Sequence, residues 1–440
     1  MAFQLDRRIL ALAIARMIDA LANSFLVVVL PLYIGQVVAL PGFVGTTVRF
    51  SGVGFTLQPE LLIGFVLSLF GFLNSFGQPF TGLWSDRTGR RKRFLLVGLA
   101  LVAVGSTGYV FSRSYLAVVL MRALQGVGAA FTIPMTVALV NEYSAEGERG
   151  GNFGLFNTFR LFGFGTGPFV AGSVVAAGPY RVMGVAVSGF DAAFLVAVVG
   201  AVLSFALISL LISDPDTTQA TAGKDISIRV RDPDGPGLDP VFALGLATVV
   251  MALSIAIYAP LANVINRQLG QGNVLFSVQF GATVLANVIF QLPFGRLSDT
   301  YGRYPFLLGG FVLLLPTTLA QGFVPLVPPS LLGASVGAPE LMILLRFLQG
   351  VAVAAVFAPS LALAGDLAGE GESGSTLSLL TMGFGLGIAF GTLFSGILVG
   401  FGFAAPFVVA TIGGIGGLLL VVTQVVEPAT EPAPTPNVGD

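Results

Sequence analysis

A few charged side chains inside long apolar stretches are the residues of this 440-residue chain that are best suited to chemistry. Asp19 is the single acid deep in such a stretch, and Arg16 precedes it by three residues, which permits an ion pair along one helix face. The chain contains no histidine and no cysteine, so imidazole and thiolate groups are excluded as proton carriers and metal ligands. A proton carried inside an apolar stretch must therefore sit on a carboxylate.

Three further arginines, Arg122, Arg160 and Arg346, also lie inside apolar stretches. If these stretches cross a membrane, a charge near the bilayer centre costs about 2.5–3.5 kcal/mol on insertion scales, so such side chains usually face the protein interior and serve its function. Arg160 is placed too deep to reach the headgroups easily, which makes it a candidate for binding a substrate or a coupling ion. Arg122 and Arg346 could instead extend toward the lipid headgroups.

The composition requires a membrane around these residues. Hydrophobic residues make up 55% of the chain and charged residues 10%, with a mean hydropathy of +0.91, which excludes a water-soluble fold. The apolar runs lack the alternation of barrel strands, so the spans must be helices. We predict an all-α integral membrane protein with twelve transmembrane helices, at 9–38, 61–82, 93–112, 115–140, 151–177, 190–212, 241–265, 274–295, 304–324, 339–363, 375–400 and 403–425.

The chain divides into two halves. Residues 213–240 carry many charges, prolines and glycines, so we predict a cytoplasmic linker between an N-terminal bundle (1–212) and a C-terminal bundle (241–426), followed by a cytoplasmic tail (427–440). Basic residues concentrate in the connections on the side of both termini, so we expect both termini in the cytoplasm. We also expect the protein in the cell membrane of a prokaryote. The scattered basic residues do not indicate nucleic acid as a partner.

An internal repeat relates the two halves. Residues 82–90 read GLWSDRTGR and residues 295–303 read GRLSDTYGR, each between the second and third predicted span of its half. A second pair of segments, RALQG from Arg122 and RFLQG from Arg346, recurs in the fourth span of each half. Two pseudo-symmetric six-helix bundles are therefore predicted.

The first repeat carries a family resemblance. The segment matches the pattern Gly-x-x-x-Asp-(Arg/Lys)-x-Gly-(Arg/Lys)-(Arg/Lys), which is typical of the major facilitator superfamily, at Gly82, Asp86, Gly89, Arg90 and Arg91. Its second copy retains Gly295, Asp299, Gly302 and Arg303. The chain resembles this family over about residues 5–425, which implies two six-helix bundles around a central cavity that opens alternately to each side of the membrane.

Two further motifs resemble the drug:proton antiporter group of that family. The segment that begins with Arg122-x-x-Gln125-Gly126 is similar to a helix 4 motif of proton-coupled members. The fifth span is similar to the antiporter motif of helix 5 and includes Gly163, Gly167 and Pro168, although Ala171 replaces one glycine of its closing pair. We expect Gly163, Gly167 and Pro168 to form a hinge or a seal, the alternative being ordinary packing of small residues.

The resemblance implies roles for the charged residues. If helices 1, 4 and 5 line the cavity, Asp19 could face Arg122 or Arg160, and its protonation would release an arginine to bind a polar or anionic group. The alternative is that Asp19 permanently holds Arg16 or Arg122 and only joins helices. The repeated segments are expected to act as cytoplasmic gates that also involve Glu142 and Arg149, or simply to set the topology.

The leading functional prediction is a secondary transporter, in which protons drive the export of hydrophobic or amphipathic small molecules. The alternative is a symporter or uniporter for a polar metabolite such as a sugar or an organic anion, held by Arg160 and Arg122. An enzyme is not expected, because the sequence offers no catalytic constellation. No ATP-binding motif is present, so an ion or solute gradient should supply the energy. We expect a monomer among membrane lipids, without a cofactor or metal.

Overall fold

The structure of the chain is a computed structural model that describes residues 6–50, 53–144, 149–182, 184–214, 230–232, 237–328, 337–367 and 373–425. Most of the predicted linker and the tail at 427–440 lie outside the described residues. The side chains of Asp86 and Arg149 do so as well, although both residues belong to helices.

Twelve helices or helical segments are long and apolar enough to cross a membrane, which confirms the predicted all-α membrane fold. Pro59 occupies the first turn of its helix, where the missing N–H costs nothing. The N-terminal bundle contains α1 Arg7–Gln36, α2 Pro59–Thr88, α3 Arg91–Phe111, α4 Tyr115–Tyr143, α5 Arg149–Ala177 and α6 Gly189–Leu211.

The seventh span is broken where the sequence predicted one helix over 241–265. The helix stops at Ala256, and Pro260 lies in a short 3-10 turn before the chain resumes as a helix. Proline cannot donate the hydrogen bond that a continuous α-helix needs, which explains the break. The C-terminal bundle contains α7 Pro240–Ala256, η1 Ala259–Leu261, α8 Ala262–Leu269, α9 Asn273–Tyr301, α10 Tyr304–Phe323, η2 Val324–Leu326, α12 Ala338–Asp366, α13 Ser373–Leu398, η3 Val399–Phe401 and α14 Ala405–Gln424.

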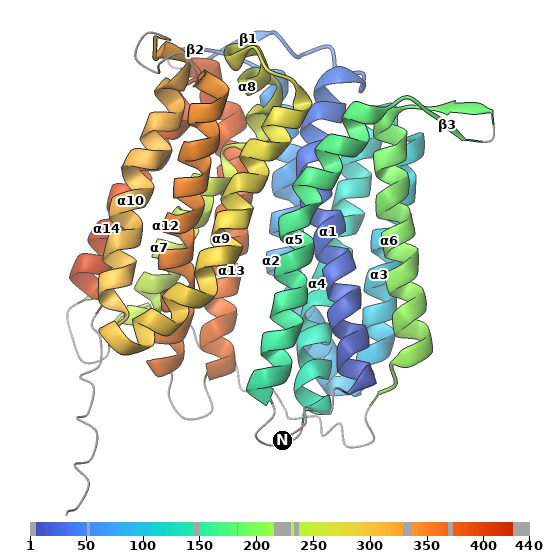
Figure 1. The fold of residues 1–440 in the computed structure, drawn as a ribbon, viewed down its shortest axis with the longest axis vertical. Coiled ribbons are helices and arrows are strands. Elements are labelled where there is room, and N and C mark those ends of the chain that lie inside the picture. The colour runs from blue at the N-terminus through green and yellow to red at the C-terminus, as the bar shows by residue number, and fades with distance from the viewer. Residues whose placement is uncertain are drawn as a thin grey trace, which may run out of the picture.

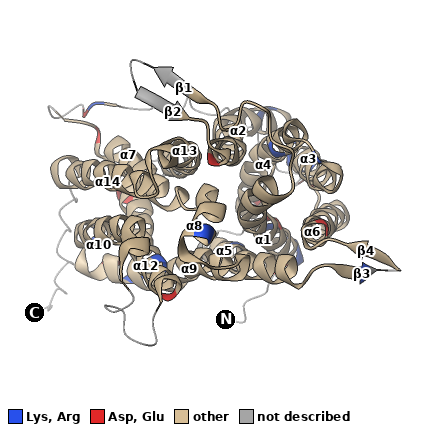
Figure 2. Ribbon diagram, turned by 90° about the horizontal axis from the view of Figure 1, so that it is seen from above, with Lys and Arg blue, Asp and Glu red and all other residues tan. Residues whose placement is uncertain are grey.

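The helices form two bundles that lie side by side (Figure 1). Seen from above, α3 and α6 lie at one outer edge and α10 and α14 at the other, whereas α8 lies between the bundles (Figure 2). Two antiparallel hairpins that the sequence did not reveal, β1 Thr47–Phe50 with β2 Val53–Thr56 and β3 Tyr180–Val182 with β4 Val185–Val187, lie at the same end as α8. We call this end the distal face and the end that carries the N-terminus the proximal face.

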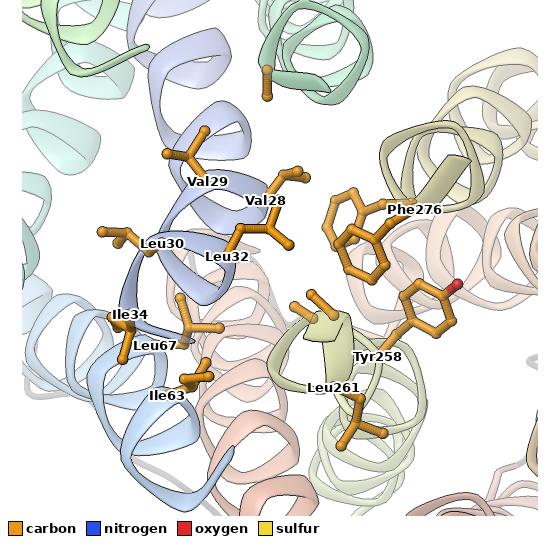
Figure 3. Packing of buried hydrophobic residues seen from close by; sticks show 14 of the residues in the cluster. Val28, Val29, Leu30, Leu32, Ile34, Ile63, Leu67, Tyr258, Leu261 and Phe276 are labelled. Carbon is orange, nitrogen blue, oxygen red and sulfur yellow. The ribbon is translucent and has the colours of Figure 1, made fainter. Parts of the chain in front are cut away.

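The bundles meet in their distal halves. A buried apolar cluster there joins α1 and α2 of one bundle to η1 and α9 of the other, and includes Val28, Leu32, Ile63, Leu261 and Phe276 (Figure 3). Small residues bring the helices close across this interface, because a Cβ at position 64 of α2 would lie 2.2 Å from the carbonyl oxygen of Thr392 in α13. The distal side of the molecule is therefore closed by packing.

The repeated segments are mostly helical, although the sequence placed them between spans. The second helix of each half continues to Thr88 and to Tyr301, and a glycine with positive φ then turns the chain. Gly89 has a φ of 64° and Gly302 a φ of 91°, a region that side chains disfavour. These two glycines allow each helix to be followed almost directly by the next at the proximal face.

Candidate functional site

Asp19 and Arg16 form an ion pair inside the N-terminal bundle. Their closest N–O distance is 2.6 Å, and the side chains are 17% and 14% exposed. Both line a small cavity together with side chains from α3, α4 and α6, among them the hydroxyl-bearing Thr132 and Thr136. Arg16 and Asp19, three residues apart on α1, therefore form the ion pair that their spacing predicted. The carboxylate of Asp19 lies deep in the span.

Arg160 lies next to this pair and binds an amide side chain of its own helix. Its Nε and Nη2 donate to Oδ1 of Asn157, one turn earlier in α5, at 3.0 and 2.9 Å. The guanidinium groups of Arg160 and Arg16 are close enough to repel each other. Among the described residues, no acid lies within ion-pair distance of Arg160, so the cluster of Arg16, Asp19 and Arg160 carries one excess positive charge.

Arg122 takes part in a different network, separate from Asp19. It is buried, donates from Nη1 to Oε1 of Gln125 at 3.1 Å and covers the ring of Phe70 at 4.3 Å. Gln125 also binds two side chains of α3, accepting from Tyr109 and donating to Ser106. Arg122 therefore joins α2, α3 and α4 instead of reaching the headgroups.

Arg346 has a matching environment in the C-terminal bundle. It is fully buried, donates from Nη1 to Oε1 of Gln349 at 2.5 Å and lies over the ring of Tyr258 at 4.1 Å. Gln349 in turn donates to the carbonyl of Ser254 in α7 and to Thr318 in α10. The two glutamines are the partners that our functional predictions omitted, although the repeated Arg-x-x-Gln motif contained them.

The glycines of α5 face α1 beside the ion pair. A Cβ at Gly163 would lie 2.0 Å from the carbonyl oxygen of Met17, and one at Gly167 would lie 2.0 Å from Oγ of Ser24. Pro168 lies inside α5, which runs unbroken past it. Gly163 thus permits the close approach of α5 to α1 at the turn that carries Arg16 and Asp19, and Gly167 permits it further along α1, beside Ser24.

At the proximal face, one arginine at the end of each repeated segment forms ion pairs within its own bundle. Arg91 binds Glu142 at the end of α4, with an N–O distance of 2.5 Å. Arg303 binds Asp299 and also reaches Asp366 of α12 at 3.3 Å. Glu142 and Arg91 are thus brought together, and Arg90 lies between α2 and α3.

The glycines of the repeated segments differ in whether a larger residue could replace them. Among the described residues, an added Cβ at Gly82 would meet no atom within 4 Å, and one at Gly295 would meet only Cβ of Ala358 at 3.9 Å, so a side chain would fit at both. Gly89 and Gly302 are limited by their positive φ, as described above.

Sequence reasoning missed a polar contact region between the bundles at the distal face. Glu60, in the first turn of α2, is buried and lies 3.5 Å from Arg267 of α8. Asn263 of α8 donates to the carbonyl of Pro31 in α1 at 2.9 Å. Pro59 directly precedes Glu60, and proline is common in the first turn of a helix. This proline is the sequence signal that could have placed Glu60 inside the second span and identified it as a second buried acid.

Comparison with known proteins gives the family. A family model described as Major Facilitator Superfamily matches residues 12–233 and 244–439. Multidrug resistance protein 2 of Bacillus subtilis is 24% identical over 269 residues, which are 60% of this chain and 65% of that protein. Multidrug transporter AQR1 of Candida glabrata is 29% identical over 153 residues, 35% of this chain and 24% of the other. The matched segments thus span less than two thirds of these relatives.

Solved structures share the fold at low identity. The peptide transporter POT matches with a TM-score of 0.69 and 16% identity, covering 96% of this chain and 94% of the other. The nucleoside transporter NupG matches with a TM-score of 0.68 and 13% identity, covering 94% and 99%. A bacterial homologue of the iron transporter ferroportin, in an inward-facing state, matches with a TM-score of 0.68 and 15% identity, covering 94% and 98%.

Proposed function

We propose that this chain, which belongs to the Major Facilitator Superfamily, exports hydrophobic or amphipathic small molecules in exchange for protons. Transport would proceed by alternating access of a central site to the two faces. Relatives that are named as multidrug proteins support this substrate class. The protein would act as a monomer in the cell membrane, with the proximal face and both termini in the cytoplasm.

The ion pair between Asp19 and Arg16 is the observation that carries the proposal. A carboxylate so deeply placed is stable as an anion only while a cation or hydrogen bonds compensate it. Protonation of Asp19 would remove the attraction and free the guanidinium of Arg16 in the small, mostly apolar cavity that this pair shares with α3, α4 and α6. A substrate that competes with the proton for this carboxylate would be exchanged for it across the membrane.

The proximal ion pairs support a gating role for the repeated segments. Arg91 with Glu142, and Arg303 with Asp366, each lie within one bundle while the distal side is closed. When the proximal side closes instead, these arginines would be brought near the opposite bundle and could exchange partners. Asp86 and Arg149 are proposed to take part in the same exchange.

Arg160 favours a second candidate function, which is proton-linked transport or uniport of a polar metabolite such as an organic anion. A guanidinium without a carboxylate partner inside the membrane is a suitable ligand for an anionic group. An anion bound there would also favour protonation of the neighbouring Asp19, so anion and proton would travel together. The sign of coupling therefore distinguishes the two candidates.

The test is transport in proteoliposomes under an imposed pH gradient, with lipophilic cations, neutral drugs and organic anions as substrates. We expect Asp19→Asn to abolish gradient-driven flux while exchange of labelled for unlabelled substrate survives. Asp191→Asn, which removes a partly exposed acid that pairs with Arg113 at the distal face, is the matched control and should transport normally. Uptake of anions together with protons would favour the second candidate, and flux indifferent to the gradient would refute both proton-coupled mechanisms.

A further inference from the structure

Glu60 is a buried acid that the proposed mechanism leaves unused. Its side chain is 4% exposed and lies where α2 meets the C-terminal bundle. On that side, a Cβ at Gly396 would lie 2.3 Å from the carbonyl oxygen of Glu60, so the two main chains are nearly in contact. Separation of the bundles at the distal face would therefore admit water to this carboxylate.

Arg267 of α8 is the one charged group that faces Glu60 within the described part of the chain. Its Nη2 lies 3.5 Å from the carboxylate, and its side chain is 71% exposed. From α4, Tyr115 approaches this turn, but its hydroxyl donates to the carbonyl of Leu62. The described residues of α1, α3, α13 and η1, which also pack against α2, bring no charged or titratable group into interaction with Glu60.

The ion pair with Arg267, the helix N-terminus and burial together decide which protonation state Glu60 prefers while the distal side is closed. An ion pair with a water-exposed arginine is a weak source of stabilisation, whereas burial of a carboxylate is costly. The position of Glu60 at the N-terminus of α2 favours its anion, but it does so whether the distal side is closed or open. The neutral acid therefore fits the closed distal interface better, and the anion fits the open one.

We propose that Glu60 is a second proton-binding site, which takes a proton from the distal side and thereby allows the two bundles to close over it. The inference rests on the proposed proton-coupled transport. It gives the protein a second proton-binding carboxylate besides Asp19, at the boundary between the bundles. If the distal face is external, external protons promote the inward-facing state. This is the return step that an exporter needs after it has released its substrate.

The experiment measures distal opening directly, without transport. Because the natural chain has no cysteine, Leu116→Cys and Leu326→Cys would supply the only attachment sites for nitroxide labels. Both positions are exposed and lie at the distal ends of α4 and η2, one in each bundle. Distances between the labels are measured by electron–electron double resonance in lipid nanodiscs across a pH series, without substrate or gradient.

In the otherwise unchanged protein, we expect the population with the longer distance to grow as the pH rises. Glu60→Gln, which imitates the protonated acid, should keep the shorter distance at every pH. Arg267→Gln removes the partner of the anion and should enlarge the pH-dependent shift, which keeps the test valid if Glu60→Gln does not fold. Glu340→Gln, at an exposed acid in the first turn of α12 on the same face, is the matched control and should behave like the parent.

The Asp19→Asn background separates this proposal from the proposed function. A pH-dependent change in label distance that persists with Asp19→Asn and disappears with Glu60→Gln supports a separate proton-binding site at Glu60. This holds whether or not transport proves to be coupled to protons. A shift that survives Glu60→Gln, or a distance that does not depend on pH in the parent, overturns the proposal.

Discussion

The contact between α5 and α1 allows a sharp test, because a single methyl group should disturb it. Gly163→Ala would place a Cβ 2.0 Å from the carbonyl oxygen of Met17, where real Cβ atoms stay beyond 3.0 Å. The obstacle is the main chain of a neighbouring helix, which cannot rotate away as a side chain can. The helices must therefore separate by about 1 Å at this point, against the close packing of the bundle.

Two opposing effects set the change in the free energy of unfolding that Gly163→Ala causes. Overpacking of this kind costs about 1–3 kcal/mol, whereas replacing glycine by alanine within a helix gains up to about 1 kcal/mol. Gly154→Ala provides a matched control on the same helix, because no atom of the described residues lies within 4 Å of its added Cβ. Both variants have the same helix-propensity gain, so the difference between them isolates the overpacking cost of about 1–3 kcal/mol.

The assay is thermal unfolding of the two variants in a mild detergent. On the scale of soluble proteins as large as one bundle, a difference of this size corresponds to about 2–12 °C, with Gly163→Ala the less stable variant. Transport by Gly163→Ala should also fall, because Met17 lies between Arg16 and Asp19. Equal midpoints for Gly163→Ala and Gly154→Ala would refute the claim that this glycine is needed for helix contact.

Two further substitutions test the polar contacts. Gln349→Leu removes the acceptor of Nη1 of buried Arg346, whose Nε and Nη2 have no hydrogen-bond partner among the described residues. We therefore expect a loss of about 1–3 kcal/mol in the free energy of unfolding, measured by heat or detergent. Unchanged stability would show that the contact is dispensable. Gly35→Ala would place a Cβ 2.1 Å from Nδ2 of Asn263 and displace this side chain from the carbonyl of Pro31. Loss of one such bond, about 0.5–1.5 kcal/mol, should increase the ratio of the distal-open to the distal-closed population roughly 2- to 13-fold in the label-distance measurement. An unaltered distance distribution would contradict this role.

The sequence predicts the fold well, because hydrophobic length and an internal repeat are strong local signals. The twelve spans could be identified without coordinates, whereas the helical course of the repeated segments and the turns at Gly89 and Gly302 came only from the structure. The break in the seventh span could not be identified either, because Pro260 is compatible with either a kinked helix or a true interruption until its neighbours in space are known. Prolines inside α1 and α5 are accommodated without a break.

Partners across space were harder to predict than the residues themselves. The i, i+3 pair of Arg16 and Asp19 was accessible because it lies on a single helix. Sequence left open whether Asp19 would also face Arg122, which in the structure instead contacts Gln125 of its own helix α4 and the ring of Phe70 in α2. Such choices depend on helix rotation and depth, which apolar periodicity defines poorly when all faces of a helix are hydrophobic.

The arginine–glutamine networks have a mechanical consequence for the molecule. Each one ties the fourth helix of its bundle to the third helix of the same bundle through directional hydrogen bonds. The surface between the bundles is by contrast largely apolar, and hydrophobic contact has little directional preference. Each bundle is thus held rigid by its own hydrogen bonds and contacts the other bundle mainly through apolar side chains. The two bundles can therefore rotate against each other as rigid bodies, with few hydrogen bonds to break.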